Sequence, residues 1–112
     1  MSEPAVAAVD LLAAEGEGPL WGLASSDLNA TLLRWGPGEG VAEHVNDELD
    51  VLIVVLAGSG VVRVDGSAVA VAAGQALLVP LGSRRSIAAG ADGLRYLSVH
   101  RRRAGLQIAV PS

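Results

Sequence analysis

Short apolar runs separated by glycine-containing turns are the feature that most constrains how this chain can fold. Valine, leucine and alanine fill these runs, and none approaches the roughly 18–20 residues that a membrane helix needs. Many short β-prone segments with tight turns are typical of a β-sandwich or a closed β-barrel. The predicted strands are 20–24, 29–35, 51–57, 60–65, 68–71, 75–79, 84–89, 94–100 and 106–110.

Turn-forming residues punctuate these strands. Asp65 and Gly66 stand between two valine-rich runs, which is a strong signal of a β-hairpin. Segments 58–60, 80–82 and 91–93 mark further turns, because each contains glycine. The chain is therefore predicted to be all-β.

The N-terminal segment 5–14 is ambiguous. Its alanine and leucine content favours a helix by intrinsic propensity, but we favour a first strand that lies across the barrel. No linker or internal repeat divides the chain, and its 112 residues are the size of one domain. We expect a single domain over residues 1–112, with 1–19 as an N-terminal arm or covering strand and 20–110 as the barrel.

Composition argues against several classes of function. The net charge is −4 and the chain contains few aromatic residues, which disfavours binding to the phosphates and bases of nucleic acid. There is no cysteine, hence no disulfide and no thiolate metal ligand. The N-terminus lacks the basic region of a secretory signal. We therefore expect a cytoplasmic protein without nucleic-acid or membrane partners.

A motif with one histidine begins at Gly38. His44 follows Gly38, Asn46 comes two positions after His44, and Gly58 closes the pattern. This order resembles the first motif of the cupin family, in which a glycine precedes two histidines, a glutamate and a final glycine. Asn46 stands at the position of the second histidine.

The glutamate position of that motif falls on one of two adjacent residues. Counting forward from His44 places Asp50 there, whereas counting back from Gly58 places Val51 there. A difference of one residue is what a β-bulge produces.

A second motif supports the same resemblance. Gly74, Pro80 and Gly82 match the framework of the second cupin motif in order and spacing. Arg85 then stands where that motif has its histidine, and Ala89 where it has an asparagine. The resemblance implies a double-stranded β-helix, or jelly-roll barrel, in which the framework is kept and the chemical positions are changed.

The resemblance also implies where a metal would bind. In metal-binding cupins, three histidines and one glutamate hold a divalent ion such as Mn, Fe, Ni or Zn inside the barrel. The matching residues here are His44, Asn46, Asp50 and Arg85. Arginine cannot ligate a metal and stays positively charged, so it repels a cation at this position. We therefore expect no standard metal site.

A remodelled metal site remains an alternative. Alternation along strand 94–100 places His100 on the same face as Tyr96. If this face looks into the barrel, His100 would join His44 and Asp50 as a metal ligand. Otherwise His100 lies at a strand end and faces solvent.

Two roles are open for Arg85. Asp50 or Glu48 could pair with it through charge-assisted hydrogen bonds, which would replace the metal–ligand bonds. Alternatively, Arg85 together with His44 and Asn46 grips an anionic ligand such as a carboxylate.

Three functions follow from these alternatives. The leading one is a small-molecule-binding cupin whose polar or anionic ligand meets a pocket formed by His44, Asn46, Asp50, Arg85 and His100. The second is a metal-dependent dioxygenase or isomerase with the remodelled ligands. The third is a barrel kept for association alone. A barrel by itself does not specify which of them applies.

The predicted strand 51–57 is apolar on both faces. One face meets the core, and the other needs cover from the N-terminal segment or from a second subunit. Cupins commonly dimerise in this way, so we expect a homodimer with isologous contacts. We expect Trp21 and Trp35 in the core or at an interface.

Overall fold

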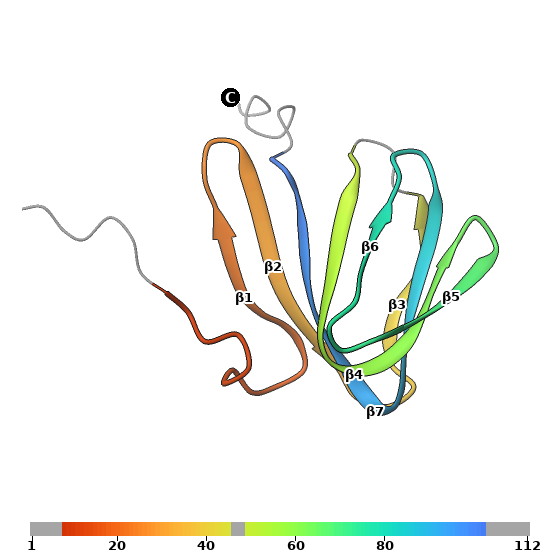
Figure 1. Ribbon diagram of the computed structural model, residues 1–112. Coiled ribbons are helices and arrows are strands. Elements are labelled where there is room, and N and C mark those ends of the chain that lie inside the picture. The colour runs from red at the N-terminus through yellow and green to blue at the C-terminus, as the bar shows by residue number, and fades with distance from the viewer. Residues whose placement is uncertain (1–7, 46–48, 103–112) are drawn as a thin grey trace, which may run out of the picture.

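The computed structural model describes residues 8–45 and 49–102, and β-strands are the only regular elements in these ranges (Figure 1). This confirms the predicted all-β class. No helix of the described residues is long and apolar enough to cross a membrane. The strands are β1 (Gly18–Ala24), β2 (Leu28–Trp35), β3 (Gly40–Val45), β4 (Val51–Val64), β5 (Ser67–Ala72), β6 (Ala76–Val79) and β7 (Arg84–Arg101).

Strands β4 and β7 are long, and each bends in its middle (Figure 1). They pair with each other on both sides of the bend, so the sheet folds over into two layers. One layer has the order β1-β2-β7-β4-β6 and the other the order β3-β7-β4-β5. The core lies between the layers and contains residues from both limbs of β4 and β7.

The prediction that strands end at 58–60 and at 91–93 is therefore wrong, because β4 and β7 continue through these segments. The chain stays extended through both, and the β4–β7 register shifts between Val55 and Ala57 and again between Gly58 and Gly60. Glycine at these positions lets a strand bend and continue, because it has no side chain to clash at the corner.

Gly58 shows what the corner requires. Its φ is +78°, and a Cβ atom built there would overlap the carbonyl oxygen of Gly93 on β7. Only glycine allows the two backbones to pass this closely. Gly58, the last glycine of the first motif, is thus required for β4 and β7 to pack closely where both strands bend.

The hairpin predicted at Asp65 and Gly66 is confirmed. Both residues have positive φ, +50° and +86°, as the tight turn between β4 and β5 requires. Strand β3 was not predicted, because its six residues alternate weakly and include charged side chains. Its pairing with β7 stabilises the extended conformation there.

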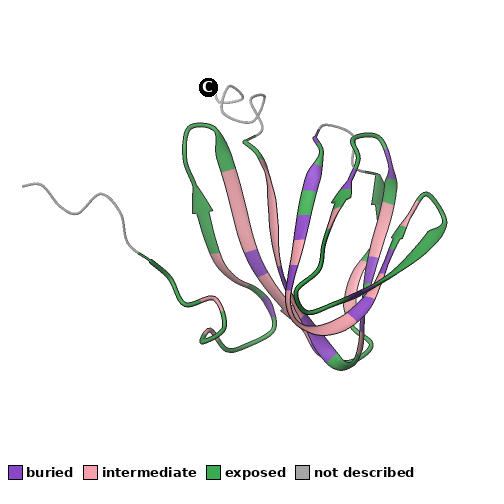
Figure 2. Cartoon of the chain, viewed as in Figure 1, coloured by how far each residue is buried: buried purple, intermediate pink, exposed green. Residues whose placement is uncertain are grey.

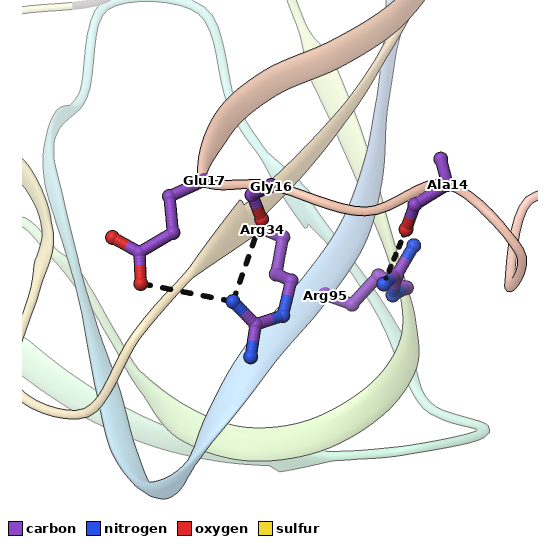
Figure 3. Close-up of polar contacts among 5 residues, drawn as sticks. All are labelled: Ala14, Gly16, Glu17, Arg34 and Arg95. Atoms are coloured by element: carbon purple, nitrogen blue, oxygen red, sulfur yellow. Dashed lines mark hydrogen bonds and ion pairs between the residues drawn. The ribbon is translucent and has the colours of Figure 1, made fainter.

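The described part of the N-terminal segment forms a turn near residues 11–13 and not the favoured strand. Arginines from two neighbouring strands hold this arm (Figure 3). Arg95 donates to the carbonyl oxygens of Leu11 and Ala14 at 2.9 and 2.8 Å, and Arg34 donates to that of Gly16 at 3.4 Å. The arm is thus fixed to β2 and β7.

The outer face of the first layer carries an apolar row that crosses five strands. The strand registers place in one line Leu23, Ala30, Val99, Leu52 and Leu78. The three leucines are 55%, 40% and 53% exposed, and no member of the row is charged. Figure 2 shows exposed and buried segments alternating along the first part of β4. The second apolar face predicted for 51–57 thus includes the exposed Leu52.

Substitution of Gly58 tests the role of the corner. We expect Gly58→Ala to lower the free energy of unfolding by roughly 3–5 kcal/mol, since it adds a clash with Gly93 to backbone strain. Gly74→Ala is the matched control: φ is +90°, but nothing lies within 4 Å of its Cβ position. We expect a loss of about 1–2 kcal/mol there. Urea unfolding measures both, and equal losses would contradict the corner argument.

Candidate ligand-binding site

A cavity of about 180 Å³ lies on the inward faces of β2, β3 and β7, between the two layers. The side chains that line it come from both limbs of β7 and from the strand paired with each limb. They are Thr31, Leu33, Val41, Arg85, Ile87, Tyr96 and Ser98. Alternation predicts that Tyr96 and Ser98 share a face of their strand, and the structure shows that this face looks into the cavity.

The bend of β7 arranges these side chains in two levels. Counted from the bend at residues 90–93, Ile87 on one limb and Tyr96 on the other lie equally deep. The strand partners Val41 and Leu33 lie beside them, so this deep level is mostly aliphatic.

The outer level lies one inward-facing position further from the bend. It contains Arg85 on one limb and Ser98 on the other, and Thr31 is the partner of Ser98 on β2. Arg85 is half-buried and is the only charged residue among the described residues that line the cavity. The outer level is therefore polar and carries a positive charge.

His44 lies opposite Arg85 in the β3–β7 register. The Nε of Arg85 donates to Nε2 of His44 at 3.4 Å, and Nδ1 of His44 lies 3.2 Å from the carbonyl oxygen of Ala42. Since arginine can only donate, Nε2 accepts and Nδ1 carries the ring proton. The hydrogen bond from Arg85 to His44 therefore helps to orient the guanidinium.

Tyr96 lies at the deep level, and its hydroxyl accepts a hydrogen bond from Nε1 of Trp35 at 3.1 Å. Burial raises the pKa of Tyr96 above its ordinary 10.0, while the bond from Trp35 and the positive charge of Arg85 oppose the increase. The hydroxyl therefore keeps its proton at neutral pH and can donate it. Trp35 packs against the core, as predicted.

The structure gives Asp50 a role different from the predicted pairing with Arg85. Its Oδ1 accepts a hydrogen bond from the backbone nitrogen of Leu81 at 2.8 Å, which ties the start of β4 to the turn before β7. Asp50 lines a separate hollow of about 230 Å³ with Leu49, Leu81 and Arg101. Glu48, the other predicted partner, lies outside the described residues.

Val51 occupies the inward position at this point of β4. It is 3% exposed and belongs to the core. Of the two counts from the motif, the one that places Val51 at the glutamate position therefore matches the inward-facing residue. An aliphatic side chain stands where a carboxylate would meet a metal.

His100 shares the inward side of β7 with Ser98 but lies near the end of the strand, opposite Asn29. Its Nδ1 lies 2.6 Å from the carbonyl oxygen of Arg101, and it is not among the described residues that line the cavity. His44, Asp50 and His100 are all described, and no three His, Cys, Asp or Glu of the described residues gather to hold a metal ion. Asn46 lies outside the described residues.

Residues 31–100, well over half of the chain, match the family described as "Cupin domain". The chain belongs to the cupin family. No curated protein matches its sequence.

Solved cupin-like structures agree with the fold. A conserved protein with a double-stranded β-helix domain from Klebsiella pneumoniae is 17% identical, with a TM-score of 0.73 over 88% of this chain and 90% of that one. A cupin protein from Bacteroides fragilis is 19% identical, with a TM-score of 0.72 over 93% and 88%. A cupin superfamily protein from Desulfitobacterium hafniense is 24% identical, with a TM-score of 0.72 over 83% and 87%. At these identities the similarity concerns the fold.

The described residues of this cupin do not fit the metal that the family implies. Arg85 places a cation at one ligand position, and Val51 places an aliphatic side chain at another. His44 remains, and its Nε2 accepts a hydrogen bond from Arg85. Arg85 and Val51 therefore do not supply the ligands that a divalent cation needs.

The sequence analysis missed four residues that line the cavity: Thr31, Leu33, Val41 and Ile87. Alternation along β2 and β7 would have placed Thr31 with Leu33 and Ile87 with Arg85 on common faces. Val41 had no such signal, because β3 itself was not predicted.

The raised pKa of Tyr96 can be measured directly, since it is the only tyrosine in the chain. We expect its phenolate absorbance to appear above pH 10.0 in the folded protein and near that value in guanidinium. Arg85→Met should raise the pKa further, because the charge of Arg85 lowers it.

The same pKa determines how stability depends on pH. The contribution of Tyr96 is fully present below its unfolded pKa and is lost as pH rises through the higher folded pKa. A folded midpoint at or below 10.0, or a lower midpoint in Arg85→Met, would contradict this description of the site.

Proposed function

We propose that this cupin binds a small anionic molecule in the cavity between its two layers, without the metal of its family. Arg85 carries the proposal, since it replaces a histidine ligand and supplies the positive charge of the cavity lining. An anion that accepts hydrogen bonds from the guanidinium would form charge-assisted bonds, which are stronger than bonds between neutral groups.

The neighbouring groups support an anion at the outer level. Ser98 and Thr31 offer hydroxyl donors across the cavity from Arg85, and Tyr96 offers a third from below. His44 holds the guanidinium through its Nε, which reduces the conformational entropy that binding would cost. Asn46 remains a predicted contact.

Paired arginine variants test this function. Small anions (acetate, butyrate, succinate and inorganic phosphate) are titrated by calorimetry and by NMR. We expect at least one to bind, and Arg85→Met to weaken it about 10–100-fold, the effect of losing a hydrogen bond between charged groups. Arg84→Met removes the same charge from an exposed neighbour outside the cavity lining, and we expect unchanged affinity.

Two results would overturn the proposal. One is that none of these anions binds the native protein at millimolar concentration. The other is that Arg85→Met and Arg84→Met have equal effects, which would place the anion on the general surface charge.

We also propose that the protein is a homodimer formed through the apolar row of Leu23, Ala30, Val99, Leu52 and Leu78. The row is continuous across five strands and uncharged, and its leucines are exposed in the single chain. Contiguous exposed apolar surface of this kind typically marks an interaction site. A second copy would cover the row by an isologous contact.

A pair of leucine variants with matched exposure tests the dimer. Leu78, at 53% exposed, belongs to the row, and Leu81, at 54%, lies in the following turn. We expect the native chain and Leu81→Lys to sediment at twice the mass of 11.3 kDa, and Leu78→Lys at that mass. A monomeric native protein, or two variants that behave alike, would contradict this interface.

A further inference from the structure

Strand β5 forms one edge of the second layer, because it pairs with β4 alone among the described strands (Figure 1). The outward backbone N–H and C=O groups of an edge strand can pair with another chain. Proteins commonly block such pairing with proline, charged side chains, β-bulges or very short edge strands. An edge that carries none of these features is a candidate interaction site.

The other three edge strands each carry such a feature. Strand β1 contains Pro19, and its register to β2 shifts beside that residue. Strand β3 contains Glu43, and its register to β7 shifts between Val41 and His44. Strand β6 has only four residues and is followed by Pro80. Strand β5 has none of them, since its six residues are uncharged, include no proline and pair with β4 in an unbroken register.

Hydrogen bonds at the end of β5 show which of its backbone groups point away from β4. The N–H of Ala72 donates to Oε1 of Gln75 at 2.9 Å, and the C=O of Ala72 accepts from the backbone N–H of Gln75 at 3.1 Å. Alternate residues of a strand point these groups to the same side. Ala68 and Ala70 therefore also point their N–H and C=O groups away from β4, where no described residue pairs with them.

Hollows that are open to solvent adjoin this edge on both faces of β5. The hollow on the side of the core reaches β6 and includes Val69 and Leu77. The hollow on the outer side reaches β4 and β7 and includes Val61 and Gly90. Ala70 belongs to both, and no charged residue of the described chain lines either of them.

An extended segment matches these features together. Its backbone can bond to the outward groups of Ala68 and Ala70, whereas the backbone groups of a helix are already bonded within the helix. Side chains of a strand alternate between its two faces, so successive side chains would lie against one hollow and then the other. The uncharged linings favour apolar side chains, because a charge placed there would be desolvated without a partner.

Arg63 supplies a charged contact at one end of this edge. It lies opposite Ala68 in the β4–β5 register and is exposed, and the described residues offer its guanidinium no ion pair or side-chain hydrogen bond. A strand added beyond β5 would lie roughly 10 Å from β4, two strand spacings away. Two long side chains can span that distance, so an acidic residue in the added strand would meet Arg63.

We propose that β5 binds an extended apolar segment of a partner protein, which adds as a further strand with an acidic residue near Arg63. This interaction goes beyond the proposed anion binding and involves neither Arg85 nor its cavity. A second copy of β5 matches the edge less well than such a segment. It would offer the same backbone groups, but β5 has no acidic residue and only alanine on its outer face.

A pair of peptides tests strand addition. The probe is acetyl-Glu-Val-Leu-Val-Leu-Glu-amide, titrated into isotope-labelled protein and followed by NMR. We expect it to bind and to shift the amide resonances of Ala68 and Ala70 downfield. The control peptide has the same side chains but carries N-methyl groups on its two central residues, which removes a donor from each edge of the peptide. We expect it to bind at least tenfold more weakly.

A third peptide tests the contact with Arg63. Replacing both glutamates of the probe by lysines keeps the apolar residues and reverses the charge. We expect binding about two- to fivefold weaker than that of the probe, the effect of losing an exposed ion pair. Equal affinity would remove the acidic residue from the proposal and overturn it in this form.

Variants of β5 test the same site from the protein side. Ala70→Pro removes an outward N–H and leaves the bonds to β4 intact, because proline is tolerated where the N–H of an edge strand faces solvent. Ala70→Lys places a charge between the two hollows and keeps the backbone. We expect each to weaken the probe at least tenfold. Ala24→Lys is the matched control, an exposed alanine on the edge strand β1, and we expect native affinity there.

Four results would overturn the proposal. The probe fails to bind the native protein at millimolar concentration, or the N-methylated peptide binds equally well, which would indicate apolar adsorption. Ala70→Lys and Ala24→Lys behave alike. The amides of Ala68 and Ala70 shift with protein concentration alone and the probe does not compete, which would make the occupant a second copy. Arg85→Met should leave peptide binding unchanged, so this test is independent of the proposed anion site.

Discussion

The paired bend of β4 and β7 is the constraint on which the rest of the structure depends. Both strands turn at the same place, and Gly58 passes so close to Gly93 that a side chain would not fit between them. Because they pair on both limbs, their inward positions face each other across the core. The bend therefore determines which side chains share a level, and it places Arg85 opposite Ser98.

A positive charge inside the barrel distinguishes this cupin from the metal-binding members that its motifs resemble. If alanine replaced the metal ligands of a cupin, the interior would become apolar. Arg85 instead places a cation and several hydrogen-bond donors there. That cation is oriented by a hydrogen bond to His44 and adjoins a buried tyrosine hydroxyl. The inner surface thus carries a cation at a position where metal-binding members carry a metal ligand.

Much of the fold was predictable because its signals are local. The hairpin at Asp65 and Gly66 follows from turn chemistry, and the valine-rich runs follow from β-propensity. The continuity of β4 and β7 was not predictable in the same way, since a glycine-containing segment marks a turn in one context and a bend in another. Residues 106–110, the last predicted strand, lie outside the described residues.

In the candidate site, too, local patterns predicted some residues, whereas others depend on long-range contacts. The match of Arg85 to a histidine position could be found from spacing alone, and alternation places Tyr96 and Ser98 on one face. That this face looks into the cavity was decided by the fold. Asp50 accepts a hydrogen bond from the backbone of Leu81, which lies 31 positions away in the chain. A local sequence pattern carries no information about such a contact.

The sequence by itself determined the class of the fold, the hairpin at Asp65 and Gly66 and the residue types at the motif positions, because propensity and spacing act over a few residues. Only the tertiary structure decided that Val51 and not Asp50 faces the interior. It also decided that His44 meets Arg85 and that four further side chains complete the cavity. These outcomes depend on the register between strands far apart in the chain, and register is a property of the packed sheet.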